Sequence, residues 1–214
     1  MEKISDMGYF PFFIDIKNKR CVVVGGGGVA LRKIEKLLPF RPHITVIAPE
    51  ICSEIQCLDG IEIICRRFRD DDLEGAFMAV GAACDNELNA RIYELCRKKN
   101  ILVNTVDDME KCGFLFPALV KRGDVTVGIS TSGRSPVYAG CLRRKIDEML
   151  DGRQAEIVEI LGRYRPVIKD MFSSAESRKS AFVELLELCL SGSEAPDDRQ
   201  INNMLEELLK NNEA

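Results

Sequence analysis

Short apolar runs alternate along the first half of the chain with segments whose apolar residues recur at helical spacing. The run Arg20–Val24 is continuous, rich in β-branched residues and followed by four glycines, as is typical of a strand buried on both faces of a parallel sheet. Residues 29–38 carry apolar side chains at helical spacing, which predicts an amphipathic helix. A second β-rich run, His43–Ala48, completes a predicted β-α-β unit.

The same alternation continues as far as residue 106. Apolar runs at residues 61–65, 77–81 and 101–106 predict three further strands, and residues 87–98 predict a helix between the last two. Strands that alternate with helices form parallel sheets covered on both faces. The pattern therefore predicts the α/β class, with a Rossmann-type doubly wound parallel sheet.

The pattern changes after residue 111. Apolar runs at residues 114–120 and 124–130 flank the turn-forming sequence Lys-Arg-Gly-Asp, which predicts a β-hairpin. A helix is predicted over residues 137–150, with Pro136 suited to its first turn. From residue 154 onward the chain predicts helices, separated by polar breaks near residues 173–179 and 191–198.

Composition narrows the class of protein. The chain has 214 residues, 46% of them hydrophobic, and lacks an apolar run long enough to suggest a membrane span. Residues 1–7 do not resemble a secretory signal, and the nine cysteines form no C-x-x-C pair, so we expect reduced thiols and a cytoplasmic location. A net charge of −4 with interspersed signs argues against a nucleic-acid surface and favours a small-molecule partner.

The four glycines carry the clearest chemical signal. Gly25, Gly27 and Ala30 match the dinucleotide fingerprint G-x-G-x-x-A between a strand and a helix. Gly25 permits the tight turn, Gly27 leaves room for a pyrophosphate, and Ala30 allows close helix packing. The phosphate then meets free N–H groups at the positive end of the helix dipole. The alternative is a glycine turn that only connects a strand to a helix.

The acidic residue that accepts the ribose hydroxyls is expected at the end of the second strand. This chain has Pro49 and Glu50 there, with Glu50 slightly beyond the usual place. A capping or solvated role for Glu50 remains open. No Arg or Lys immediately follows that strand to hold a 2′-phosphate, which favours NAD over NADP.

Several ordered motifs between residues 9 and 150 together resemble the precorrin-2 dehydrogenases, which include the amino-terminal module of sirohaem synthase. The motifs are Tyr-Phe-Pro-Phe-Phe-Ile-Asp-Ile-Lys from residue 9, Val-Val-Val-Gly-Gly-Gly from 22, Ala-Pro from 48, Val-Asn-Thr-Val-Asp from 103 and Ile-Ser-Thr-Ser-Gly-Arg-Ser-Pro from 129. The resemblance implies NAD-dependent oxidation of precorrin-2 to sirohydrochlorin. Some members of the family also insert Fe²⁺, as a substrate, to make sirohaem, and the resemblance extends to that activity.

The resemblance also implies an organisation and a set of site residues. It divides the chain into an NAD-binding domain (1–113), a dimerisation segment (114–150) that makes a homodimer, and a helical domain (151–214). By the family's motifs Asp107 corresponds to the aspartate proposed to act in both reactions. The positions that contact NAD correspond to Gly28, Val29, Pro49 and Glu50.

A carboxylate at Asp107 also suits the chemistry. It follows a predicted strand at the sheet edge where such folds bind ligands, and a base placed there can take the proton that oxidation releases. Repulsion from Asp108 would raise its pKa if the two side chains faced each other. A plain turn-capping role remains the alternative.

The loop before the helix at 137 is a candidate substrate contact. The hydroxyl groups of Ser130, Ser132 and Ser135 and the guanidinium of Arg134 suit the carboxylates that fringe a tetrapyrrole. A serine-rich helix-capping loop explains the same residues.

One loop departs from the family, because Ala82-Ala-Cys-Asp85 stands where an Ala-Ala-Thr-Asp-like turn is usual. Asp85 and Asn89 remain as polar candidates there, or as plain surface-loop residues. Since His43 is the only histidine, we expect no resident metal site, and chelation rests on the resemblance alone. Two other functions stay open: a regulatory module that binds NAD without catalysis, and a dehydrogenase of another small substrate.

Overall fold

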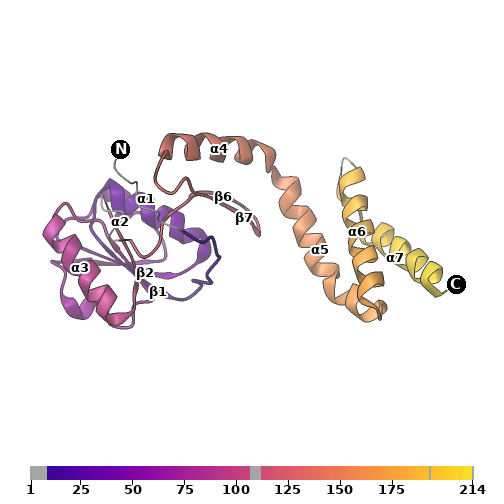
Figure 1. Cartoon of the computed structure of the whole chain (residues 1–214), viewed down its shortest axis with the longest axis horizontal. Coiled ribbons are helices and arrows are strands. Elements are labelled where there is room, and N and C mark those ends of the chain that lie inside the picture. Colours follow the sequence, from indigo (N-terminus) through magenta and orange to yellow (C-terminus); the bar gives the residue numbers. More distant parts are fainter. Residues whose placement is uncertain (1–8, 107–111, 193, 214) are drawn as a thin grey trace, which may run out of the picture. The chain divides into compact units, whose positions relative to one another are not determined.

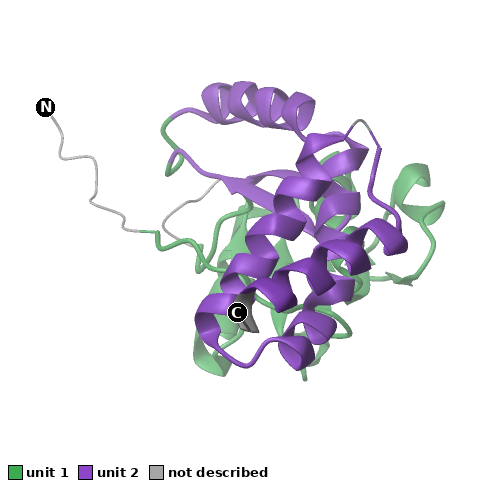
Figure 2. Cartoon of the chain, turned by 90° about the vertical axis from the view of Figure 1, so that its right-hand side faces the viewer, with its two compact units in different colours: residues 1–117, 132–134 green, residues 118–131, 135–214 purple. Residues whose placement is uncertain are grey.

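The computed structural model describes residues 9–106, 112–192 and 194–213. They fall into two compact units, one within residues 1–117 together with 132–134, the other within residues 118–131 and 135–214 (Figure 2). No helix in the described part of the chain is both long and apolar enough to cross a membrane.

The first unit is built on a five-stranded parallel sheet (Figure 1). The strand order of this sheet is β3-β2-β1-β4-β5. Its strands pair in parallel register throughout. They are β1 (Arg20–Val24), β2 (His43–Ala48), β3 (Ile61–Cys65), β4 (Met78–Gly81) and β5 (Leu102–Thr105). The order reverses beside β1, because the chain passes from β1 outward to β3 and then returns to β4. The doubly wound Rossmann arrangement expected from the sequence is confirmed.

Alternate side chains of β1 enter different cores, as the period of a strand requires. Cys21 and Val23 join the cluster that contains helix α1 (Gly28–Leu37). Val22 and Val24 join the opposite cluster with helix α3 (Asn86–Lys99). A strand buried on both faces must be continuously apolar, which explains the Cys-Val-Val-Val run. Burial also raises the pKa of the Cys21 thiol to about 11.

Short elements complete this unit. They are η1 (Leu38–Phe40), α2 (Ser53–Gln56) and η2 (Asp70–Leu73). Each is too short for its apolar residues to recur at helical spacing in the sequence. Helix α3 is followed by its C-cap Asn100, whose φ of 55° lies in the left-handed region that asparagine tolerates.

The hairpin of the second unit pairs β6 (Ala118–Arg122) with β7 (Val125–Ile129) in antiparallel register. The sequence predicted that the first strand of the hairpin begins at residue 114, but β6 begins four residues later. The segment before β6 instead contacts β5 and α1. The Gly113 N–H donates to the Val103 carbonyl at 2.8 Å, and Lys36 donates to the Pro117 carbonyl at 2.9 Å. The ammonium of Lys33 also lies 4.3 Å from the centre of the Phe116 ring. The segment therefore packs along β5 and α1.

Four helices follow the hairpin: α4 (Pro136–Met149), α5 (Gly152–Met171), α6 (Ala175–Ser191) and α7 (Asp198–Glu213). The core of the last three contains the fully buried Ile168, Leu185, Ile201 and Leu205. Arg153 reaches the end of α6, where its guanidinium donates to the Cys189 carbonyl at 2.9 Å. The helical remainder expected from the sequence is confirmed.

Candidate functional site

The glycine turn lies where the strand order of the sheet reverses. Gly25 directly follows β1, and its N–H donates to the Ile47 carbonyl of β2 at 3.0 Å. On the other side, the Ala82 N–H that follows β4 donates to the Val24 carbonyl at 2.8 Å. Ligands of doubly wound sheets bind in the crevice outside the carboxyl ends of the strands at such a reversal. The turn is therefore positioned for a ligand by the topology of the sheet.

The first two glycines of the turn are enclosed by backbone. Gly25 has a φ of 133°, and a Cβ added there would lie 2.3 Å from the Ala82 carbonyl oxygen. A Cβ on Gly26 would lie 2.1 Å from the Glu50 carbonyl oxygen. The Gly26 carbonyl in turn accepts a 2.8 Å hydrogen bond from the N–H of Cys52. Gly26 thus fastens the turn to the loop after β2, a role that the fingerprint does not assign to it.

The next two glycines face open space. Among the described residues, a Cβ on Gly27 would have no neighbour within 4 Å, and one on Gly28 would approach only the Arg32 side chain, at 3.9 Å. Helix α1 begins at Gly28, receives no side-chain cap at Gly27 and has no acidic residue in its first turn. Its N-terminal N–H groups and dipole therefore offer an uncapped anion site. Val29 is half-buried and Ala30 fully buried beneath the turn, as close helix packing requires.

Pro49 and Glu50 are exposed beyond the end of β2, beside the turn. The close approach of the Glu50 carbonyl to Gly26 places the backbone of Glu50 next to the glycines. Glu50 follows the strand by two residues, slightly beyond the usual place of the ribose-binding carboxylate.

Asp85 and Asn89 support the loop after β4. The Asp85 carboxylate caps α3 by accepting from the N–H groups of Glu87 and Leu88 at 2.9 and 3.1 Å. The buried Asn89 amide donates to the Ala83 carbonyl at 2.9 Å and accepts from the Ala83 N–H at 3.2 Å. Both side chains are engaged in holding the fold, whereas Cys84, immediately before Asp85, is exposed.

The carboxyl end of β5 holds a polar group that sequence reasoning missed. The side-chain amide of the buried Asn104 donates to the Phe114 carbonyl at 2.9 Å and to Cys112 Sγ at 3.3 Å. The Cys112 thiol donates to the Thr105 carbonyl at 3.3 Å. Among the described residues, Asn104 Oδ1 is buried without a hydrogen-bond partner. Asp107, the expected catalytic residue, lies outside the described residues.

The serine loop is divided between the two compact units. Ser132 and Arg134 group with the first unit and Ser130 and Ser135 with the second, so the loop lies at their chain junction. Ser135 is the N-cap of α4, and its hydroxyl accepts from the Tyr138 N–H at 3.2 Å. The capping role that the sequence left open for this loop thus applies to Ser135. Ser130, Ser132 and Arg134 are exposed.

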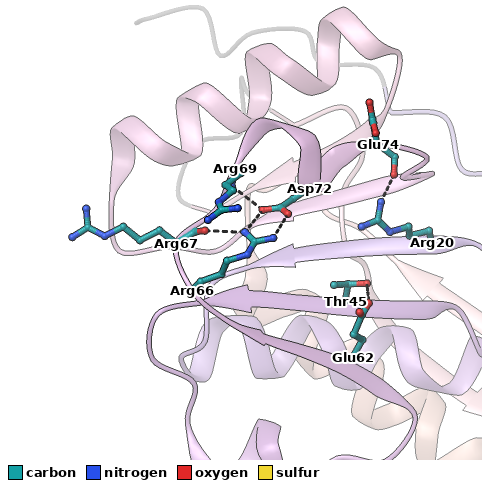
Figure 3. Close-up of polar contacts among 8 residues, drawn as sticks. All are labelled: Arg20, Thr45, Glu62, Arg66, Arg67, Arg69, Asp72 and Glu74. Carbon is teal, nitrogen blue, oxygen red and sulfur yellow. Dashed lines mark hydrogen bonds and ion pairs between the residues drawn. The ribbon is translucent and has the colours of Figure 1, made fainter.

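An ion pair fixes the loop that follows β3 (Figure 3). The Arg66 guanidinium donates to both oxygens of Asp72, at 2.6 and 2.8 Å, and Asp72 also accepts from the Arg69 N–H at 2.7 Å. The hydrogen bonds from Arg66 lower the pKa of the buried Asp72 carboxyl, against the opposing effect of burial. The sequence shows three arginines after β3, but it does not show that Arg66 pairs with Asp72.

Comparison with known proteins identifies the family. A family described as "Putative NAD(P)-binding" matches residues 12–118, half of the chain. This chain belongs to that family. A nicotinamide dinucleotide is therefore the cofactor class of the first unit.

The NAD(P)-binding family assignment agrees with the open half of the glycine turn. The space above Gly27 and the uncapped N-terminus of α1 fit a pyrophosphate, because neither side chain nor carboxylate occupies that place. Gly27, Gly28 and Val29 would hold the phosphates, and Glu50 the adenosine ribose.

Three relatives named siroheme synthase align with most of this NAD(P)-binding chain. The protein of Thioalkalivibrio sulfidiphilus is 35% identical over 97% of the chain and 44% of its own length. That of Buchnera aphidicola is 37% identical over 84% and 38%, and that of Blochmanniella pennsylvanica 39% over 76% and 35%. The chain thus spans less than half the length of these curated relatives.

A solved structure shares the fold. SirC, described as a precorrin-2 dehydrogenase, superposes with a TM-score of 0.71 at 23% identity, covering 94% of this chain and all of that one.

Metal-binding geometry is absent from the described part of the chain, where no three His, Cys, Asp or Glu side chains gather around one point. His43 is the first residue of β2 and lines a shallow hollow with Arg20, Thr45 and Glu62. That hollow lies at the amino ends of the strands, on the edge opposite the glycine turn.

Proposed function

We propose that this chain oxidises precorrin-2 to sirohydrochlorin with NAD. The observation that carries the proposal is an open dinucleotide turn in a chain that aligns over 97% of its length with a siroheme synthase. The structural likeness to a precorrin-2 dehydrogenase supports the same reaction.

The oxidation removes a hydride and a proton from the tetrapyrrole. NAD, when bound, accepts the hydride. Asp107, which follows β5 by two residues, takes the proton as general base. Ser130, Ser132, Ser135 and Arg134 hold the carboxylates of the substrate, for which hydroxyl groups and a bidentate guanidinium are suited donors.

NAD is preferred to NADP because Glu50 offers a carboxylate to the ribose hydroxyls and no cation immediately follows β2. We further propose that the chain is a cytoplasmic homodimer. In this proposal residues 1–113 bind NAD, residues 114–150 form the dimer contact and residues 151–214 form a helical domain. The nine free cysteines suit a reducing compartment.

The test is an anaerobic reaction of the purified chain with precorrin-2 and NAD, followed by the absorbance of NADH and of sirohydrochlorin. We expect both products in equal amounts. Asp107→Ala should lower the rate by about 100-fold or more, the range for loss of a general base, while NAD still binds. Asp108→Ala is the control, because it removes the neighbouring carboxylate and should retain activity.

Each other result has a meaning. NAD binding without NADH formation would exclude precorrin-2 as the substrate, and equal activity of wild type and Asp107→Ala would remove the assigned base. Adding Fe²⁺ after oxidation tests chelation: insertion above the uncatalysed rate, lost in Asp107→Ala, would make the chain bifunctional.

A further inference from the structure

Glu50 and Arg67 follow neighbouring strands, each two residues beyond its strand end. Ala48 at the end of β2 is the register partner of Cys65 at the end of β3. Each charged residue lies two positions beyond its paired strand end, and adjacent strands are about 4.8 Å apart. A carboxylate and a guanidinium therefore leave the sheet at the same edge, on the side of the ribose expected at Glu50.

The neighbours of Arg67 are already engaged. Arg66 is paired with Asp72, and it also donates to the Arg67 carbonyl at 3.0 Å, which holds the backbone of Arg67 (Figure 3). Asp72 also accepts the N–H of Arg69. The Arg66 side chain thus supports the loop, and Arg69 supports it through its backbone.

The guanidinium of Arg67 is left to solvent. Its side chain points away from the Arg66–Asp72 pair in Figure 3, and the residue is exposed. Within the described ranges no carboxylate forms an ion pair with it. Between residues 49 and 65 the sequence contains no Lys or Arg, so Arg67 is the first cation after β2 that forms no ion pair among the described residues.

We propose that Glu50 and Arg67 together determine the choice between NAD and NADP, with Glu50 selecting the free 2′-hydroxyl and Arg67 forming a latent site for a 2′-phosphate. The carboxylate accepts hydrogen bonds from the ribose hydroxyls but repels a phosphate placed there. Arg67 attracts that phosphate from the adjacent strand end. This inference rests on the proposed dinucleotide function and deepens it.

The experiment measures dissociation constants of NAD⁺ and NADP⁺ by titration calorimetry on the full chain, independently of catalysis. We expect wild type to bind NAD⁺ more tightly. Glu50→Gln should tighten NADP⁺ binding by about tenfold or more, because a like charge is removed from beside the phosphate. Adding Arg67→Gln to that variant should abolish the gain and reduce the dependence of NADP⁺ affinity on salt.

Arg41→Gln in the Glu50→Gln background is the matched control. Arg41 is an exposed arginine immediately before β2, at the opposite edge of the sheet, so its loss changes net charge equally. It should leave the gain in NADP⁺ affinity intact.

Different results would contradict the inference about NAD and NADP and the proposed dinucleotide function on which it rests. If NAD⁺ binds but Glu50→Gln leaves NADP⁺ affinity unchanged, or if Arg67→Gln and Arg41→Gln act alike, the inference is wrong and the dinucleotide function stands. If wild type binds neither dinucleotide, both are wrong. Thermal unfolding of each variant, expected within a few degrees of wild type, verifies that the fold is retained.

Discussion

The two halves of the glycine turn differ in what surrounds them. Gly25 and Gly26 are packed against backbone from the loops after β4 and β2, whereas Gly27 and Gly28 face open space. The first half has no side chains because the protein itself occupies the room, whereas in the proposed function the second half leaves room for the dinucleotide. Under that proposal one run of identical residues serves folding at one end and binding at the other.

Gly25→Ala should have the largest effect on folding. The substitution combines a backbone conformation that other residues rarely adopt with a clash against the Ala82 carbonyl. We expect a loss of about 4 kcal/mol in the free energy of unfolding. Chemical denaturation of the purified variant measures it, and a loss below about 1 kcal/mol would show that the turn can rearrange.

Gly26→Ala should be the next most damaging. Its Cβ would meet backbone atoms of Glu50 and Ile51, which cannot move as a flexible side chain can. A loss of about 2 kcal/mol is expected from overpacking. The same denaturation experiment tests it, and a variant as stable as wild type would mean that the loop after β2 is not fixed by this contact.

Asp72→Asn tests whether the Arg66–Asp72 ion pair stabilises the loop after β3, at the same edge of the sheet as the glycine turn. Removing the carboxylate partner of Arg66 should cost about 1–2 kcal/mol at neutral pH. The pKa of Asp72 is lowered in the fold, so its stabilisation is fully present above the ordinary pKa of about 4 and is lost as the pH falls through the lowered value. Unfolding curves of both proteins from neutral pH to pH 2 should therefore converge, and a constant difference would contradict the assignment.

Gly27→Ala should have the smallest effect on folding and a clear one on binding. No atom of the described part of the chain lies within 4 Å of the added methyl group, so we expect stability within about 0.5 kcal/mol of wild type. Dinucleotide affinity should fall by about tenfold or more, because the methyl group stands where the pyrophosphate approaches. Calorimetric titration measures it, and unchanged affinity would remove the distinction between the two halves.

The sheet was predictable because its signals are local. The bounds of β1, β2 and β3 agree with the apolar runs, and a strand buried on both faces leaves little freedom of composition. The start of β6 was not predictable. Residues 114–117 are as apolar as a strand, but contacts with Lys33 and Lys36 of α1 hold them elsewhere.

The candidate site divides in the same way. Gly25, Gly27 and Ala30 were identified because their fingerprint is a contiguous pattern with a known geometry. The Asn104–Cys112 contact and the Arg66–Asp72 pair could not be predicted from the sequence, since neither partner alone indicates which residue it will contact in the fold.

The sequence by itself determined the elements of the sheet, the glycine turn and the family, because each depends on residues adjacent in the chain or on a periodic pattern. Only the tertiary structure decided which glycines are enclosed, which side chains of the loops already have partners, and that Glu50 and Arg67 follow paired strand ends. Those properties depend on strand register and on backbone approaching from distant segments, which no local pattern encodes.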